Sequence, residues 1–150
     1  MLKAPPPILA IVYVMAAAAA SYLAGWPGLP RALLTRLGSV LVVIGVTLAG
    51  SAIVLFRRKG TEINPMSPAN RALVTSGPFR LTRNPMYSGL VTVSLGVACW
   101  VGDWPMFLAP VALFVTLNWV HIPFEEEKMR RQFGEAFDAY RAKVGRWIWG

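Results

Sequence analysis

Four apolar stretches, separated by short polar or basic breaks, constrain this chain more than any other feature of its sequence. They run over residues 8–23, 37–56, 85–101 and 105–122. A helix crosses the hydrocarbon core of a bilayer with about 20 mostly apolar residues, and it satisfies its backbone hydrogen bonds within one segment. None of the stretches shows the alternation of a barrel strand. The sequence therefore predicts an all-α integral membrane protein with about four transmembrane helices, forming a single membrane-embedded domain over residues 1–150.

The charge balance agrees with a membrane protein and excludes a soluble basic one. Lys and Arg number 15 against 7 acids, a formal net charge of +8, yet only 15% of residues are charged and 55% are hydrophobic. Soluble domains carry about 25% charged residues, so we expect a lipid bilayer and no nucleic acid as partner. The single cysteine, Cys99, and the single histidine leave no cluster of metal ligands, and no metal site is predicted.

Basic residues also set the expected orientation of the four spans. The segment 57–84 holds six basic residues and one acid, and an even number of spans places it on the same side as both termini. Basic loops stay on the cytoplasmic side, so 57–84 and the tail 124–150 are predicted to be cytoplasmic. A cleavable signal peptide over residues 1–25 is an alternative, which would leave three spans.

Two features predict how the spans pack. The turn Gly102–Trp104 is so short that the last two spans must form an antiparallel hairpin. The second span carries Gly38, Gly45, Ala49 and Gly50, and small residues at helical spacing allow two helices to approach closely. Helix packing is the expected role of these small residues, with a groove for a ligand as the alternative.

The segment Thr61–Tyr87 does not resemble an ordinary loop. Several Pro and Gly residues break any long helix there, while Leu73, Val74 and Phe79 argue against disorder. Asn84 followed by Pro85 is typical of a helix N-cap and first turn. The third span is therefore expected to begin at Pro85, with its positive dipole end facing the cytoplasm.

The tail after Phe124 is predicted to be an amphipathic helix that lies against the membrane or against the preceding cytoplasmic segment. Its apolar residues recur at near-helical spacing, at Met129, Phe133, Phe137, Tyr140 and Val144. Glu126–Arg130 and Glu127–Arg131 are favourable i,i+4 pairs. Residues 147–149 are expected to anchor the tail at the membrane interface.

Three consecutive acids, Glu125–Glu127, open that tail at a membrane edge rich in cations. They need basic partners, and the cytoplasmic segment 57–84 offers Arg71, Arg80 and Arg83.

At these two segments the chain resembles a family of integral-membrane methyltransferases, which includes isoprenylcysteine carboxyl methyltransferases and phospholipid methyltransferases. The resemblance covers about the C-terminal 90 residues, and several motifs recur in order on one side of the membrane. The matching residues are Leu73–Phe79, Arg83–Gly89, Glu125–Glu127, Phe133–Glu135 with Tyr140, and Arg146–Trp147.

The resemblance implies S-adenosyl-L-methionine as methyl donor, S-adenosyl-L-homocysteine as product, and a cytoplasmic cofactor pocket. The residues that it implies for cofactor binding are Leu73, Val74, Phe79, Asn84, Pro85, Tyr87, Glu125 and Glu126. Asn64 and Arg71 are weaker correspondences, because the loop there varies. His121 and Arg83 are the candidates for catalysis, by orienting or deprotonating the acceptor.

Two departures from the family pattern bear on the substrate. Asn84 stands where the family motif usually has His, a variant common in bacterial members. The expected location is a bacterial inner membrane. Asn cannot serve as a base. His121 lies near the position of a substrate-contacting Arg in carboxyl-methylating members, and a neutral His lacks the bidentate fork that Arg offers a carboxylate.

The methyl acceptor therefore stays open between a lipid amine, a prenylated thiol carboxylate, and a small thiol or phenol. Two alternatives from other classes are a small four-helix transporter and a non-catalytic membrane scaffold. Cofactor binding separates both of them from an enzyme.

Overall fold

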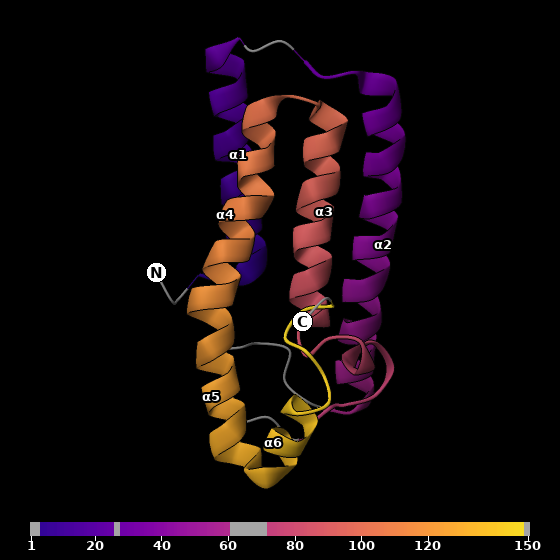
Figure 1. Cartoon of the computed structure of the whole chain (residues 1–150), viewed down its shortest axis with the longest axis vertical. Coiled ribbons are helices and arrows are strands. Elements are labelled where there is room, and N and C mark those ends of the chain that lie inside the picture. The colour runs from indigo at the N-terminus through magenta and orange to yellow at the C-terminus, as the bar shows by residue number, and fades with distance from the viewer. Residues whose placement is uncertain (1–3, 26–27, 61–71, 149–150) are drawn as a thin grey trace.

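In the computed structural model, which describes residues 4–25, 28–60 and 72–148, four long helical segments stand side by side (Figure 1). The helices that form them are α1 (Pro6–Ala24), α2 (Arg31–Arg58), α3 (Pro85–Val101), α4 (Leu108–Thr116) and α5 (Ile122–Phe133). The short helix α6 (Glu135–Arg141) turns back beneath α5. The described residues contain no strand, which confirms the predicted all-α fold.

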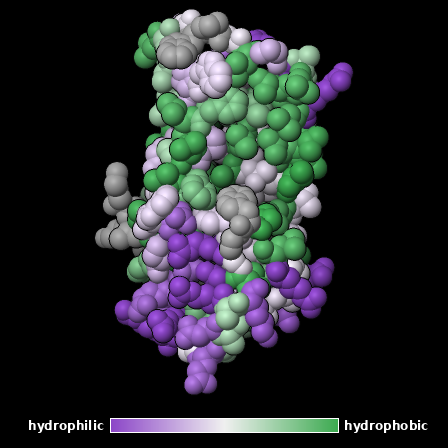
Figure 2. Space-filling view, in the orientation of Figure 1, coloured by the Kyte–Doolittle hydropathy of each residue, from purple (hydrophilic) through white to green (hydrophobic). Residues whose placement is uncertain are grey.

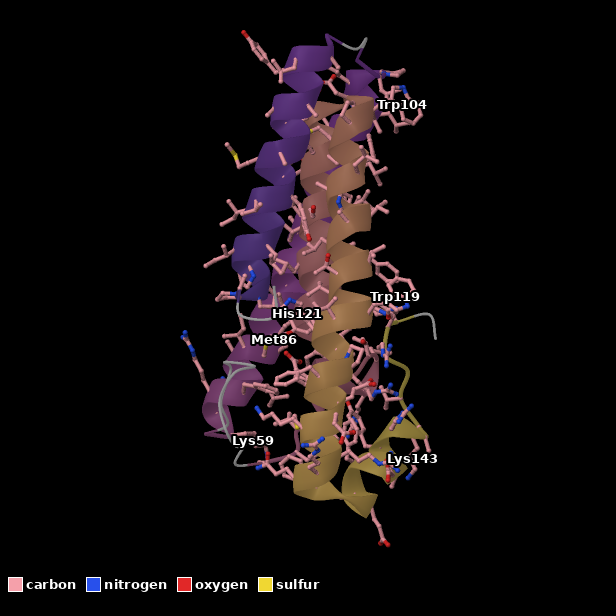
Figure 3. The ribbon with its side chains drawn as sticks, turned by 90° about the vertical axis from the view of Figure 1, so that its left-hand side faces the viewer. Lys59, Met86, Trp104, Trp119, His121 and Lys143 are labelled. Atoms are coloured by element: carbon pink, nitrogen blue, oxygen red, sulfur yellow. The ribbon has the colours of Figure 1, made fainter. Side chains whose placement is uncertain are left out.

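Three of these segments are long and apolar enough to cross a membrane. They are α1, α2 and the continuous run Trp104–Phe133, while α3 is equally apolar but has only 17 residues. On the face shown in Figure 2, hydrophobic side chains cover most of the upper part, and hydrophilic side chains gather at the lower end. That end holds Lys59 and Lys143, whereas Trp104 lies at the opposite end (Figure 3). The polar end corresponds to the side that the sequence predicts to be cytoplasmic.

Four glycines bring α2 and α3 into close contact. Gly38 lies opposite Gly96, and Gly45 lies opposite Gly89. A Cβ built on Gly45 would lie 2.6 Å from the carbonyl oxygen of Gly89, and one built on Gly38 would lie 2.6 Å from that of Gly96. Such distances leave no room for a side chain, so the backbones themselves form the interface. Helix packing, the expected role of the small residues in the second span, is confirmed for Gly38, Gly45 and Ala49, whereas a Cβ on Gly50 would meet nothing within 4 Å. Ala49 also lines the cavity described below.

The upper end of the bundle is tied by two polar contacts. The Ser21 hydroxyl donates to Asp103 Oδ2 at 2.6 Å, and the Leu29 amide donates to the Gly102 carbonyl at 2.7 Å. Gly102 adopts a φ of 74° where α3 ends, a conformation that favours glycine. The predicted antiparallel hairpin between the last two spans is present, and these contacts join it to the α1–α2 connection (Figure 1).

The fourth span continues into the tail without a break. A π-helical turn, Leu117–His121, lies between α4 and α5, and the helix runs on to Phe133. It then stops at Gly134, whose φ of 51° and ψ of −127° no other residue adopts readily. The prediction of a single tail helix is therefore wrong, because this glycine divides the tail into the end of α5 and α6.

The expected interfacial anchor is also wrong for Trp147. Its ring is 6% exposed and packs on Phe114 of α4, with ring centroids 4.7 Å apart. Its indole Nε1 donates to Asn118 Oδ1 at 2.9 Å. Trp147 is therefore part of the bundle core, because its indole N–H finds a partner inside the protein and has no need of the interface. Ile148 is exposed, and Trp149 lies outside the described residues.

Candidate functional site

A cavity of about 270 Å³ lies at the polar end of the bundle, where α2 ends and α3 and α5 begin. Side chains from α1, α2, α3, α5, α6 and the 72–84 segment all reach it. Its lining residues are Pro6, Pro7, Ala49, Ile53, Phe56, Leu73, Val74, Phe79, Arg83, Asn84, Pro85, Met86, Tyr87, Leu90, Glu125, Glu126, Lys128, Met129, Phe137 and Tyr140. The cavity therefore combines an apolar wall with a small set of charged and polar groups, which is typical of small-molecule sites.

An acid and a phenol meet at the wall between α3 and α5. The Tyr87 hydroxyl, in the first turn of α3, donates a hydrogen bond to Glu125 Oε1, in the first turn of α5. Both side chains line the cavity, and Tyr87 is otherwise buried in the core between α1, α3 and α4. The pair places a carboxylate beside an aromatic ring, an arrangement that suits a ligand carrying a positive charge.

The neighbouring acid, Glu126, is held by two arginines. Arg83 Nη2 lies 2.7 Å from Glu126 Oε1, and Arg146 Nη2 lies 2.6 Å from Oε2. The side chains of Glu126 and Arg83 are only 13% and 9% exposed. Both carboxylate oxygens of Glu126 are thus engaged by guanidinium groups.

The predicted pair Glu126–Arg130 is therefore wrong, since Glu126 turns toward these distant arginines. Arg130 contacts Asp138 of α6 instead, with Nε 3.5 Å from Oδ1. The predicted pair Glu127–Arg131 is confirmed at 2.8 Å on the exposed face of α5.

Asn84 and Pro85 form the start of α3 as the sequence predicts, with Asn84 at the N-cap position. The Asn84 side chain makes no capping hydrogen bond, however, and its Nδ2 donates to the Arg146 carbonyl at 3.2 Å. The backbone N–H of Asn84 donates to Thr82 Oγ1 at 3.1 Å. The Asn84 side chain therefore joins the start of α3 to the C-terminal residues.

The apolar wall is built around Phe79, in the short 3-10 turn Gly77–Arg80. Its ring stacks on Phe56 near the end of α2, with centroids 5.0 Å apart and planes 5° from parallel. The Tyr140 hydroxyl donates to the Phe79 carbonyl at 2.6 Å. Burial raises the pKa of the Tyr140 phenol to about 12, although nearby Arg83 lowers it, so the phenol stays protonated and keeps this bond. The tail thus packs against the 72–84 segment, one of its two predicted positions.

His121 is the predicted site residue that does not line the cavity. It closes the π-helical turn one helical turn before Glu125, at an intermediate height of the bundle (Figure 3). Its side chain is 5% exposed, and its Nε2 is buried with no hydrogen-bond partner among the described residues. π-Helical turns are often found at functional sites. The structure therefore places His121 on the membrane side of the Tyr87–Glu125 pair, outside the cavity itself.

The structure brings together the eight residues predicted for cofactor binding, together with Arg83, around one cavity. Whether they bind a cofactor stays a prediction. Sequence reasoning missed the contributions of Phe56 and Lys128 to the cavity lining, since nothing local in the sequence shows what they face. It matched Arg146 to the family pattern without showing that this residue pairs with Glu126. The apolar spacing of Met129, Phe137 and Tyr140 was a usable signal, because this tail stripe supplies the cavity wall. Asn64 and Arg71 lie outside the described residues.

The fold and the site together define a class: a small all-helical integral membrane protein with an acid- and aromatic-lined cavity at its polar end. The model of the phospholipid methyltransferase family matches residues 33–136, more than half of the chain. The chain belongs to this family of membrane methyltransferases, as its motifs indicate.

Curated relatives carry names that agree with this family. A probable protein-S-isoprenylcysteine O-methyltransferase of Oryza sativa subsp. indica is 32% identical over 112 residues, covering 71% of this chain and 56% of the relative. Protein-S-isoprenylcysteine O-methyltransferase B of Arabidopsis thaliana is 27% identical over 118 residues, covering 74% and 57%. The chain thus spans little more than half the length of these relatives. No solved structure gives a significant match.

Proposed function

We propose that this protein transfers a methyl group from S-adenosylmethionine to an acceptor that is dissolved in the membrane or otherwise hydrophobic. The observation that carries the proposal is the Tyr87–Glu125 pair inside an apolar, aromatic cavity at the polar end of the bundle. The donor is a cation with an amino group, a ribose and an adenine. The side chains that line the cavity fit this molecule. An acid and aromatic faces suit its cationic part, and apolar side chains suit the adenine.

The proposed cofactor residues divide between two parts of the cavity. Glu125 and Tyr87 would hold the charged and hydroxyl-bearing parts of the donor, beside Asn84 and Pro85 at the positive end of α3. Phe79, Val74 and Leu73 would pack on the flat base, with Glu126 fixing the wall between them.

The chemistry asks little of the protein beyond position and exclusion of water. When bound, the donor would supply an activated methyl group: the acceptor's lone pair would bond to the methyl carbon as the carbon–sulfur bond breaks, leaving S-adenosylhomocysteine, and any acceptor proton would pass to a base or to solvent. The chain's own contribution is to orient both partners in an apolar site, since correct placement lowers the barrier of a two-reactant step. His121, buried one turn toward the membrane from Glu125, is the group proposed to orient or deprotonate the acceptor.

The cavity wall supports an acceptor that arrives from the lipid side. Pro6 of α1, Ile53 of α2 and Leu90 of α3 all reach the cavity, so two candidate membrane spans and the shorter apolar helix α3 border it. The acceptor classes proposed are an isoprenylcysteine-like carboxylate, a phospholipid amine or a small thiol. Incubating membranes with S-adenosylmethionine labelled in its methyl group, and asking whether the protein, lipid or small-molecule fraction takes up the label, distinguishes them.

Calorimetric titration of the purified protein with S-adenosylhomocysteine tests the donor site without knowledge of the acceptor. We expect Glu125→Ala to weaken binding by about 1–3 kcal/mol, the range of a hydrogen bond to a charged group. Glu127→Ala is the matched control, because Glu127 lies two positions on and pairs with Arg131 on the exposed face. Undiminished binding in a Glu125→Ala, Tyr87→Ala double variant would contradict the site assignment. A transporter or scaffold would show no binding at all.

A further inference from the structure

The C-terminal strap, defined here as residues 143–148, is bonded along its length to the segment that leads into α3. The Arg83 amide donates to the Gly145 carbonyl at 2.9 Å, and Thr82 Oγ1 donates to the Arg146 carbonyl at 2.8 Å. Asn84 Nδ2 donates to the same Arg146 carbonyl. Thr82 is fully buried beneath these contacts. The strap is therefore an integral part of the structure on which α3 begins.

The strap is also anchored in the bundle core. Trp147 inserts beside Phe114 and bonds to Asn118, and Arg146 Nη1 lies 3.4 Å from both the side-chain oxygen and the carbonyl of Asn118. Arg146 thus reaches from the π-helical turn that follows α4 to Glu126 in α5. Its own side chain does not line the cavity.

Arg83 is held just as closely from the other side. Its Nε and Nη2 donate to Glu126 Oε1, and its Nη1 donates to the carbonyls of Arg141 and Val144. All three guanidinium nitrogens are engaged by the protein, and arginine does not lose its proton in proteins. These bonds assign Arg83 to holding the structure together, and a role in moving an acceptor proton does not fit them.

We infer that Arg146, acting through Glu126 together with Arg83, is a positioning residue that sets the Tyr87–Glu125 pair for donor binding. This inference rests on the proposed function. Glu126 adjoins Glu125 in the first turn of α5, while Arg83 lies four residues before Tyr87 at the start of α3. The bridge Arg146–Glu126–Arg83 therefore fixes the two helix starts that carry the acid and the phenol. A largely buried acid that loses one arginine shifts toward the remaining one or toward water, and Glu125 shifts with it.

The test is the affinity of Arg146 variants for S-adenosylhomocysteine. Calorimetric titration gives this affinity and the fraction of protein that binds, and the unfolding temperature is measured on the same preparation. We expect Arg146→Gln to weaken the affinity for S-adenosylhomocysteine at least about tenfold, while the number of binding sites per protein stays the same as in the wild type. Arg146→Lys keeps the charge but not the two-pronged geometry, so we expect a smaller loss of affinity. Arg131→Gln is the matched control, since it removes the same charge from an exposed ion pair on α5 and should bind as the wild type does.

A merely structural strap predicts a different result. Arg146→Gln would then unfold at a lower temperature, while its folded fraction would bind with wild-type affinity, and this outcome overturns the inference. Should Arg146→Gln not fold, wild-type affinity in Arg146→Lys overturns it equally. Adding Glu126→Gln to Arg146→Gln should weaken binding little further if both act through one bridge, whereas additive losses contradict a shared role. Absence of binding in the wild type would overturn the proposed function, and this inference with it.

Discussion

The packing of α2 on α3 makes Gly89→Ala an informative substitution. A Cβ at Gly89 would lie 2.5 Å from the Gly45 carbonyl oxygen, 2.8 Å from Ala49 Cβ and 2.9 Å from the Ala49 amide nitrogen. Two of these three neighbours are backbone atoms, which no rotamer change can move aside. Because carbon contacts are comfortable at about 3.5 Å, the two helices must separate by about 1 Å to admit the methyl group.

That separation acts on the cavity directly. Ala49 lines the cavity on α2, and Met86 and Leu90 line it on α3, on either side of the glycine contact. Overpacking of a close interface costs about 1–3 kcal/mol, which should appear as a lower unfolding temperature in detergent. A displacement of about 1 Å within an active site can reduce turnover about 100-fold, so affinity for S-adenosylhomocysteine and methyl transfer should both fall.

Gly50→Ala is the control that the chain itself provides. Gly50 is on α2, five residues after Gly45, and a Cβ built on it would meet nothing within 4 Å. An alanine at that position should be neutral or stabilise the helix by up to about 1 kcal/mol. The reasoning is refuted if Gly89→Ala has the same unfolding temperature and the same affinity for S-adenosylhomocysteine as Gly50→Ala.

Two further predictions concern the tail. Tyr140→Phe should destabilise the fold by about 1–3 kcal/mol in chemical denaturation, because it leaves the buried Phe79 carbonyl without its donor. Since the folded pKa of Tyr140 is raised from 10.0 to about 12, the stability from this phenol is complete below pH 10 and is lost as the pH rises toward 12, and the variant should lack this component of the alkaline decline. Gly134→Ala should cost about 1–3 kcal/mol in the same assay, because alanine does not adopt its backbone angles readily; unchanged stability would mean that the α5–α6 corner is not fixed by this glycine.

The sequence predicts most reliably what depends on a residue's near neighbours. Apolar length places the membrane helices, Asn84–Pro85 marks where α3 begins, and the spacing of Glu127 and Arg131 gives a real ion pair. The length of the fourth helix is predicted less well. An apolar pattern ends near Ile122, but the backbone hydrogen bonds of a helix continue until a residue such as Gly134 interrupts them.

The errors at Glu126 and Trp147 share a different cause, since each concerns a side chain whose partner is distant in the sequence. Glu126 has Arg130 one turn away, yet it pairs with arginines 43 and 20 residues distant. Tryptophan is a residue type typical of interfacial anchors, yet Asn118 provides an acceptor for the indole N–H of Trp147 inside the bundle. The family resemblance gathers the residues of the site without geometry, so it includes both Glu126 and Arg146 but does not show that they pair.

The three consecutive glutamates show how one short motif can hold three roles. Successive residues of a helix point about 100° apart, so Glu125, Glu126 and Glu127 meet different surroundings. Glu125 faces a phenol in the cavity, Glu126 lies between two arginines, and Glu127 is 53% exposed beside Arg131. An acid that binds a cation must not already be neutralised by fixed cations, and of the first two only Glu126 is enclosed by a pair of guanidinium groups. In the proposed site, the Glu126 carboxylate between two arginines would fix the start of α5, and this would hold the adjacent Glu125 carboxylate in place for a ligand.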